Sequence, residues 1–266
     1  MIRIGEKLNS SIPRTREAVE KRDAAYVIRL AKKQLSAGAD ALDVNAAAFM
    51  AGEPDALVWL VQTVQQATGV RLMIDTPNAV AAAAALAADT VGSAILNSVT
   101  LEEARFDAML PLVLQYETGV VALPISPAGM PRTAAERFNN AGELIARLRA
   151  NGIPDTRIYI DPLVETLSSD HMSASVMLET IRLVRAEYPD VNILCGVSNV
   201  SYGLPGRKSL NAAFLTGAIL AGANAAIFDV AEPAMREAAA VAEALAGKDE
   251  YCMEYIRYYR ENAAKE

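Results

Sequence analysis

The sequence is poor in the residues that usually hold transition metals. It contains one histidine, His171, and two cysteines, Cys195 and Cys252. A structural zinc centre needs about four such ligands, and two cysteines cannot build a disulfide framework. We therefore expect no tightly bound metal, with an all-oxygen Mg²⁺ site built from aspartates as the weaker alternative. His171 is expected to be a solvated loop residue, and Cys195 a small buried apolar residue.

Positive charge and long apolar runs are also scarce. The chain has 25 Lys and Arg against 32 Asp and Glu, a formal net charge of −7. This balance argues against electrostatic binding to nucleic acid or to an acidic membrane surface. No apolar run reaches the ~20 residues that a membrane-spanning helix needs, and no signal-like segment opens the chain. We expect a cytoplasmic protein without a nucleic-acid or membrane partner.

Aromatic residues are few, and what is abundant instead is alanine within a repeating pattern. Aromatics make up 6 % of the chain and hydrophobic residues 52 %. Short apolar runs alternate about eight times with amphipathic helical stretches, which predicts parallel strands covered by helices. At ~250 residues, this pattern fits a (β/α)8 TIM barrel, here one domain over residues 1–266. An open doubly wound sheet is the alternative, although no Gly-x-Gly-x-x-Gly follows any predicted strand.

Capping and turn residues predict where individual helices begin. Asp23 is expected to cap one helix, and Pro54 to open another. The segment Glu6–Arg22 is expected to be a loop, and Glu250–Glu261 an extra C-terminal helix. Three more helix starts are predicted from a Thr-Pro pair and two Thr-x-x-Glu capping boxes: Thr76-Pro77, Thr100 with Glu103, and Thr133 with Glu136.

Polar residues follow almost every predicted strand. In a barrel of this type the carboxyl ends of the strands form the site. Each Asp or Asn alone could cap the next helix, but Asp161 precedes Pro162 and a long loop, where it caps no adjacent helix. Carboxylates and carboxamides together suit a neutral heterocycle with an amino-amide edge. The residues are Glu6, Asp43, Asn45, Asp75, Asn97, Ser126, Asp161, Ser198, Asn199 and Asp229.

Covalent chemistry has little support in this pattern. A Schiff-base enzyme needs a lysine at a strand end, and only Lys7 lies near one. We expect Lys7 to be a surface cation. Ser126 and Ser198 lack a neighbouring histidine that could activate them.

Six segments, in order and at matching spacing over essentially the whole chain, resemble the pterin-binding methyltransferases. The resemblance is to methyltetrahydrofolate:corrinoid protein methyltransferases, including the corrinoid/iron–sulfur protein enzyme and the methylcorrinoid:tetrahydrofolate enzymes of demethylation systems. The folate domain of cobalamin-dependent methionine synthase is related. The segments are Gly5-Glu6-Lys7-Leu8-Asn9, Ala41-Leu42-Asp43-Val44-Asn45, Asp75-Thr76-Pro77-Asn78, Asn97-Ser98, Tyr159-Ile160-Asp161-Pro162-Leu163 and Gly196-Val197-Ser198-Asn199-Val200-Ser201.

The resemblance implies a barrel like that of dihydropteroate synthase, a homodimer, and methyl transfer between N5 of tetrahydrofolate and a corrinoid (cobalamin) on a partner protein. It implies that Asp75, Asn97 and Asp161 hold the pterin edges, above a floor at Gly196 and Ser198. It assigns Asn199, as the catalytic group, to N5. Asp43 would join the polar network, and Arg207 would reach the aminobenzoyl-glutamate tail.

Two alternatives stay open at this point. The basic pair Arg207-Lys208 also fits a dihydropteroate-synthase-like enzyme that forms a C–N bond, although the first loop lacks that family's usual Thr-Pro-Asp-Ser-Phe run. A folate-binding module without chemistry of its own is the other alternative.

Overall fold

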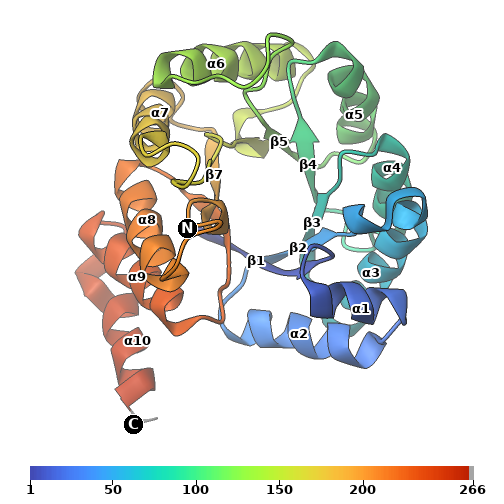
Figure 1. The fold of residues 1–266 in the computed structure, drawn as a ribbon, viewed down its shortest axis with the longest axis horizontal. Helices are drawn as coiled ribbons and strands as arrows, with labels where there is room; N and C mark the ends of the chain where they lie inside the picture. The colour runs from blue at the N-terminus through green and yellow to red at the C-terminus, as the bar shows by residue number, and fades with distance from the viewer. Residues whose placement is uncertain (264–266) are drawn as a thin grey trace.

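The fold is a closed barrel of parallel strands inside a ring of helices, seen in a computed structural model that describes residues 1–263 (Figure 1). Hydrogen-bonded neighbours follow the chain order from β1 to β8, and β8 closes onto β1. The strands are β1 (Ile2–Asn9), β2 (Ala41–Asn45), β3 (Arg71–Asp75), β4 (Ile95–Val99), β5 (Gly119–Ala122), β6 (Ile158–Ile160), β7 (Asn192–Gly196) and β8 (Ala225–Phe228).

The helices lie outside the strands, and the last one, α10, extends from α9 at the lower left of Figure 1. They are α1 (Pro13–Glu20), α2 (Ala24–Ser36), α3 (Glu53–Thr68), α4 (Ala79–Ala88), α5 (Glu103–Gln115), α6 (Ala134–Ala150), α7 (Ser173–Glu187), α8 (Arg207–Ala221), α9 (Pro233–Leu245) and α10 (Met253–Ala263). Short 3-10 helices are η1 (Ala47–Gly52), η2 (Asp155–Arg157), η3 (Val197–Asn199) and η4 (Glu250–Cys252).

This architecture confirms the predicted (β/α)8 barrel and its extra C-terminal helix, and it rules out the open sheet. The expected domain runs to residue 266, and residues 264–266 lie outside the described part. Within residues 1–263, no helix is long and apolar enough to cross a membrane.

Two apolar clusters build the core. The larger one fills the space between the strands and the surrounding helices. The smaller one fills the inside of the barrel with one residue from each strand: Ile4, Ala41, Met73, Ile95, Val121, Tyr159, Leu194 and Ala225. Because side chains alternate along a strand, the residue two positions further on must also point into the barrel.

The predicted loop over Glu6–Arg22 is wrong. β1 continues to Asn9, and α1 begins at Pro13, a residue favoured at the first helical position. The polar residues that suggested a loop are the end of a strand whose side chains face the barrel opening. The pairing of β1 with β2 shifts between Gly5 and Leu8, so one extra residue bulges out there.

The capping predictions were right in two cases and wrong in two. Asp23 accepts from the Tyr26 N–H at 3.0 Å, and Thr133 with Glu136 forms the predicted capping box. Asn78, rather than Thr76, caps α4, because the Thr76 hydroxyl is buried and donates to Glu53. The box predicted at Thr100 is absent, since α5 begins after Glu102 and has no side-chain cap.

Candidate functional site

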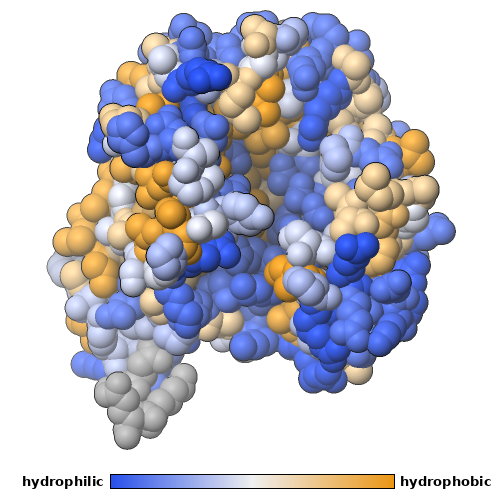
Figure 2. Space-filling view, viewed as in Figure 1, coloured by the Kyte–Doolittle hydropathy of each residue, from blue (hydrophilic) through white to orange (hydrophobic). Residues whose placement is uncertain are grey.

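A polar layer lies directly above the apolar layer inside the barrel, on the side where the strands end. Except for Asp229, its members each stand two residues beyond one of these apolar residues, so the same face of each strand carries both. Asp229 follows the last residue of β8 and stands four residues beyond Ala225. Figures 1 and 2 look toward this end, and Figure 2 shows a central hollow lined mostly by hydrophilic residues. The layer consists of Glu6, Asp43, Asp75, Asn97, Asp161, Gly196 and Asp229.

One chain of polar contacts joins β8, β1 and the end of β7. The Lys7 ammonium lies 2.9 Å from Asp229 Oδ2 and 3.2 Å from Glu6 Oε1, and the Ser198 hydroxyl donates to Glu6 Oε2 at 2.7 Å. The bulge in β1 allows adjacent residues to reach this network. The expectation that Lys7 is a surface cation is wrong, since its side chain is only 31 % exposed and pairs with two carboxylates. These contacts raise the pKa of Lys7 against the opposing effect of burial, so it stays charged.

A second chain of contacts orients Asp75. The Asn45 amide donates to Asp75 Oδ2 at 2.9 Å, and the Ser10 hydroxyl donates to Asn45 Oδ1 at 3.2 Å. The same Asn45 oxygen accepts from the Ala47 N–H. One oxygen of Asp75 is therefore held by β2, and its other oxygen makes no hydrogen bond to the described residues.

Asp43 is the most deeply buried carboxyl group of the layer. Its residue surface is 3 % exposed, and its Oδ1 has no hydrogen-bond partner among the described residues. Burial, followed by the charges of Asp75 and Glu6, raises the pKa of Asp43 well above its usual value. Asp43 stands inside β2 rather than at its end, because Asn45 is the last residue of that strand.

Arg105 is a cation of the site that sequence reasoning missed. It lies on the α5 helix that follows β4, and its guanidinium donates to the carbonyl and hydroxyl oxygens of Ser98 at 3.1 and 2.9 Å. Burial raises the pKa of Asp75, whereas the Asn45 hydrogen bond and then the Arg105 charge lower it. An arginine in the first turn of the helix after a polar strand end was the only signal in the sequence.

Asp161 stands at the end of β6 and caps no helix, as predicted. Its Oδ1 accepts from the Leu163 N–H at 2.8 Å. Loss of solvation raises the pKa of Asp161 to about 6, against the lowering effects of backbone hydrogen bonds and of the Arg137 charge. Asn97 stands inside β4 rather than at its end, and its side chain has only a 3.9 Å contact from its amide to the Met73 sulfur. Both side chains can therefore take further hydrogen bonds from a ligand.

The end of β7 forms an open floor beneath an exposed carboxamide. Gly196 has no side chain, and Asn199 Nδ2 lies 3.3 Å from where a Cβ on Gly196 would be. Arg207 Nη2 donates to the Ser198 carbonyl at 2.8 Å, and its Nε donates to Ser201 Oγ at 3.0 Å. The Asn199 side chain is exposed and makes no hydrogen bond to the described residues. It is thus available to a molecule lying on Gly196.

The remaining candidates lie outside this site. Ser126 lies four residues beyond β5, in a turn with Gly129. The His171 side chain is 91 % exposed in a loop, and Cys195 is buried, as predicted. Among the described residues, no three His, Cys, Asp or Glu side chains are grouped so as to hold a metal ion.

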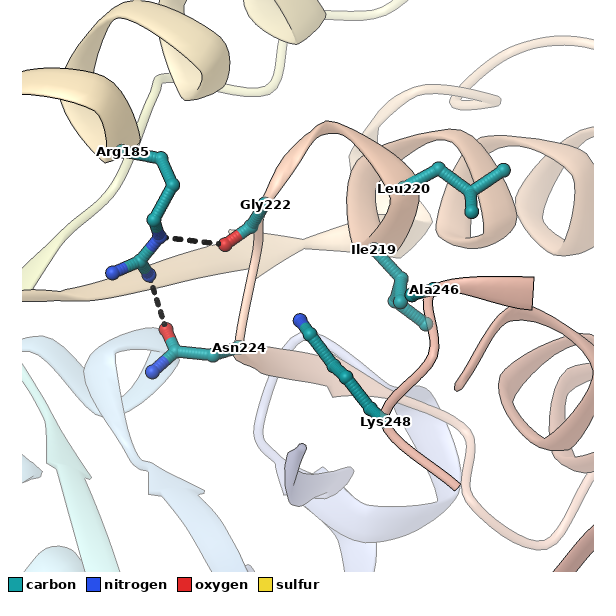
Figure 3. Close-up of a pocket in the computed structure, with 7 residues that line it drawn as sticks. All are labelled: Arg185, Ile219, Leu220, Gly222, Asn224, Ala246 and Lys248. Atoms are coloured by element: carbon teal, nitrogen blue, oxygen red, sulfur yellow. Dashed lines mark hydrogen bonds between the residues drawn. The ribbon is translucent and has the colours of Figure 1, made fainter. Parts of the chain in front are cut away.

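A separate cavity of about 430 Å³ opens near the other end of the barrel (Figure 3). Its lining includes Arg185, which donates to the Gly222 carbonyl and to Asn224 Oδ1, both at 3.1 Å. Arg185 also donates to the carbonyls of Pro189 and Val191. Its hydrogen bonds brace the turn that enters β8, so this arginine has a structural role away from the mouth.

Comparison with known proteins identifies the family. Residues 6–229 match the family described as pterin binding enzyme. The chain belongs to the pterin-binding enzymes. A methylcorrinoid:tetrahydrofolate methyltransferase of Eubacterium limosum is 33 % identical over 263 residues, covering 98 % of this chain and 97 % of that protein. The methionine synthase of Mycobacterium tuberculosis is 30 % identical over 237 residues, covering 84 % of this chain and 20 % of that much longer protein.

Solved structures support the fold of this pterin-binding enzyme. A dihydropteroate synthase of Xanthomonas albilineans superposes with a TM-score of 0.69 at 23 % identity, covering 91 % of this chain and 92 % of that one. The Yersinia pestis dihydropteroate synthase gives 0.68 at 20 % identity, with the same coverage. At these identities the likeness shows the barrel alone. The curated relatives confirm the expected class of enzyme, a methyltransferase.

Proposed function

We propose that this pterin-binding enzyme moves a methyl group between N5 of tetrahydrofolate and the cobalt of a corrinoid carried by a partner protein. The observation that supports this most is the exposed Asn199 carboxamide above the bare floor at Gly196, inside a ring of carboxylates. The likeness to a methylcorrinoid:tetrahydrofolate methyltransferase over nearly the full length of both chains supports the same reaction.

The carboxylates suit the donor groups on the pterin edge. Asp75 keeps one oxygen unoccupied while Asn45 holds the other, and Asp161 accepts a backbone hydrogen bond through Oδ1. Ionised carboxylates accept hydrogen bonds only, whereas the Asn97 amide can donate and accept. Asp75, Asn97 and Asp161 would therefore bind and orient the ring without acting on the methyl group.

Asn199 is the residue that would act on the transfer. When bound, the partner's corrinoid supplies the cobalt that accepts or donates the methyl group. A neutral amide near N5 can both donate and accept, so it can stabilise charge and a proton on that nitrogen as they develop. Arg207 and Glu6 hold Ser198 on both sides, which keeps the neighbouring Asn199 in place.

The contacts made by the basic pair Arg207-Lys208 weaken the dihydropteroate synthase alternative. Arg207 is committed to Ser198 and Ser201, and Lys208 pairs with Glu232 at 2.8 Å. Each cation would have to leave these partners to neutralise a diphosphate leaving group. The homodimer and the cytoplasmic location stay predictions, and light scattering after size-exclusion chromatography would test the first.

The Asn199→Ala variant tests the proposed role in transfer. Losing one preorganised hydrogen-bonding group typically costs ~3 kcal/mol in the transition state, about a hundredfold in rate. We expect single-turnover transfer between 5-methyltetrahydrofolate and cob(I)alamin to slow by about that factor. Tetrahydrofolate affinity, measured by calorimetry on the same samples, should change little. Equal transfer rates in the variant and the wild type would refute the assignment.

A further inference from the structure

We propose that Arg137 is a positioning residue that fixes the Asp161 carboxylate in the orientation needed to bind the pterin. The inference rests on the proposed function, because it assumes that Asp161 contacts the ring. Arg137 lies on α6, outside the barrel strands, and it belongs to none of the motifs that drew attention to the mouth.

The burial and bonding of Arg137 are those of a brace between two loops. It is 1 % exposed and is among the largest fully buried side chains of the described residues. Its guanidinium donates to the carbonyls of Pro162 and Leu163 at 2.8 and 2.6 Å, and to the Pro131 carbonyl at 3.3 Å. Its other partner is the carboxylate of Glu165. Arg137 therefore ties the loop after β5 to the loop after β6.

The segment whose carbonyls accept from Arg137 is the one that follows Asp161. Leu163 has a φ of +64°, a left-handed conformation that a branched side chain such as leucine adopts only when its surroundings impose it. In this conformation the Leu163 N–H donates to Asp161 Oδ1 at 2.8 Å. Because Arg137 holds the carbonyls of residues 162 and 163, it imposes the backbone conformation that aims this N–H at Asp161.

The same loop also supports the segment that carries Asn199. The Leu167 N–H donates to the Val200 carbonyl at 3.0 Å, and the Thr166 hydroxyl donates to the Tyr202 carbonyl at 2.6 Å. The loop is thus held by Arg137 at its start and by the loop after β7 further along. A change at Arg137 would disturb Asp161 first, because the Leu163 carbonyl bonds directly to the guanidinium.

The charge of Arg137 also reaches Asp161. The titratable groups that face this carboxyl are the Arg137 guanidinium from α6 and the buried Cys195 thiol from β7. Arg137 lowers the pKa of Asp161, whereas burial raises it. Removing the guanidinium should therefore let the pKa rise further, and ligand binding that needs the ionised carboxylate should be lost at a higher pH.

The experiment compares tetrahydrofolate affinity, measured by calorimetry across pH 5 to 8, in wild type, Asp161→Asn, Arg137→Met and Arg137→Lys. We expect Arg137→Met to weaken binding about tenfold at pH 7, as one lost buried hydrogen-bonding arrangement would. In this variant the loss of affinity on acidification should begin at a higher pH than in the wild type. Arg137→Lys should fall between, because one ammonium cannot reach all four acceptors. If Arg137→Met does not fold, the affinity of Arg137→Lys tests the proposal instead.

Two further variants separate positioning from a general loss of stability. Adding Leu163→Gly to Arg137→Met should recover part of the affinity, since glycine adopts a positive φ readily. Arg147→Met, on the same helix but paired with Glu103 at the surface, is the matched control and should leave affinity unchanged.

The outcomes distinguish a failure of the positioning role of Arg137 from a failure of the proposed function. If Asp161→Asn binds tetrahydrofolate like the wild type, the pterin site itself is misassigned. If Asp161→Asn binds weakly while Arg137→Met and Arg137→Lys keep wild-type affinity and an unshifted pH profile, the positioning role of Arg137 is overturned.

Discussion

Five carboxyl groups stand at the barrel mouth, yet they are not equivalent. Burial raises the pKa of Asp43 well above its usual value, whereas Asp75 is held by Asn45 and is near the charge of Arg105. Glu6 and Asp229 share the Lys7 ammonium. The neighbours of each carboxyl therefore differ in how much of its hydrogen-bonding capacity they leave for a ligand.

Removing the Asp75 carboxylate should weaken ligand binding more than it slows methyl transfer. In Asp75→Ala, the donors of the pterin edge would lose their acceptor, which costs ~1–3 kcal/mol, or about fivefold to 150-fold in affinity. Calorimetry with tetrahydrofolate measures this directly. Asp107→Ala, which removes an exposed aspartate of α5, is the control and should bind normally. Unchanged affinity in Asp75→Ala would exclude the carboxylate from the binding site.

Ligand binding should depend on the ionisation of Asp161. The pKa of this group is raised to about 6, so the accepting carboxylate predominates above that pH and is lost as the pH falls below it. Tetrahydrofolate affinity should therefore decline between about pH 7 and pH 5. In Asp161→Asn this part of the decline should disappear, because the amide does not titrate in that range. A decline that is the same in both proteins would assign it to another group.

At the scale of the elements, side chains alternate between the two faces of a strand, and this two-residue repeat allowed most of the candidate site to be predicted from the sequence. Residues two positions beyond the apolar strand centres face the barrel, so the strand-end list contained most of the polar layer. Sequence reasoning failed where a long-range contact decided the outcome. Thr76 looks like a helix cap, but Glu53 from α3 takes its hydroxyl. The polar end of β1 looks like a loop because nothing in the local sequence shows that it faces the barrel mouth.

Arg105 and Arg137 were missed for the same physical reason. Each lies on a helix and reaches a loop or strand end through contacts that only the folded chain brings together. Helical periodicity indicates only which face of a helix is apolar, and a buried arginine contradicts that pattern. Their partners are mostly backbone carbonyls, which every residue possesses and which carry no sequence signal.

Gly5 is closely packed at the position where the bulge in β1 begins. A Cβ there would lie 2.5 Å from Gln34 Oε1 and 2.9 Å from Leu42 Cδ2, and the same Gln34 oxygen accepts from the Lys7 N–H at 3.0 Å. Gly5→Ala should therefore destabilise the fold by ~1–3 kcal/mol, seen as a lower midpoint in urea. Gly217→Ala in α8 is the control, because its Cβ would make ordinary contact at 3.5 Å with Leu178. Equal destabilisation of both variants would argue against the packing account.

At the scale of the whole molecule, the residues that stabilise the barrel lie apart from the residues of the candidate site. The apolar layer and the helix ring form the core, and the carboxyl ends of the strands carry the polar layer and its loops. This common scaffold also explains why dihydropteroate synthases superpose well at low identity. The fold alone therefore does not choose between methyl transfer and C–N bond formation. Under the proposed function the mouth residues carry that choice: Asn199 makes no side-chain hydrogen bond to the described residues, whereas Arg207 bonds to Ser198 and Ser201 and Lys208 pairs with Glu232.

The most direct measurement is methyl transfer by the wild-type protein, followed by visible absorbance in both directions. One reaction contains 5-methyltetrahydrofolate and cob(I)alamin, the other tetrahydrofolate and methylcobalamin. We predict protein-dependent transfer in both, and no dihydropteroate when the protein is given a pterin diphosphate and aminobenzoate. Tetrahydrofolate binding without any transfer, or formation of dihydropteroate, would contradict the proposed function.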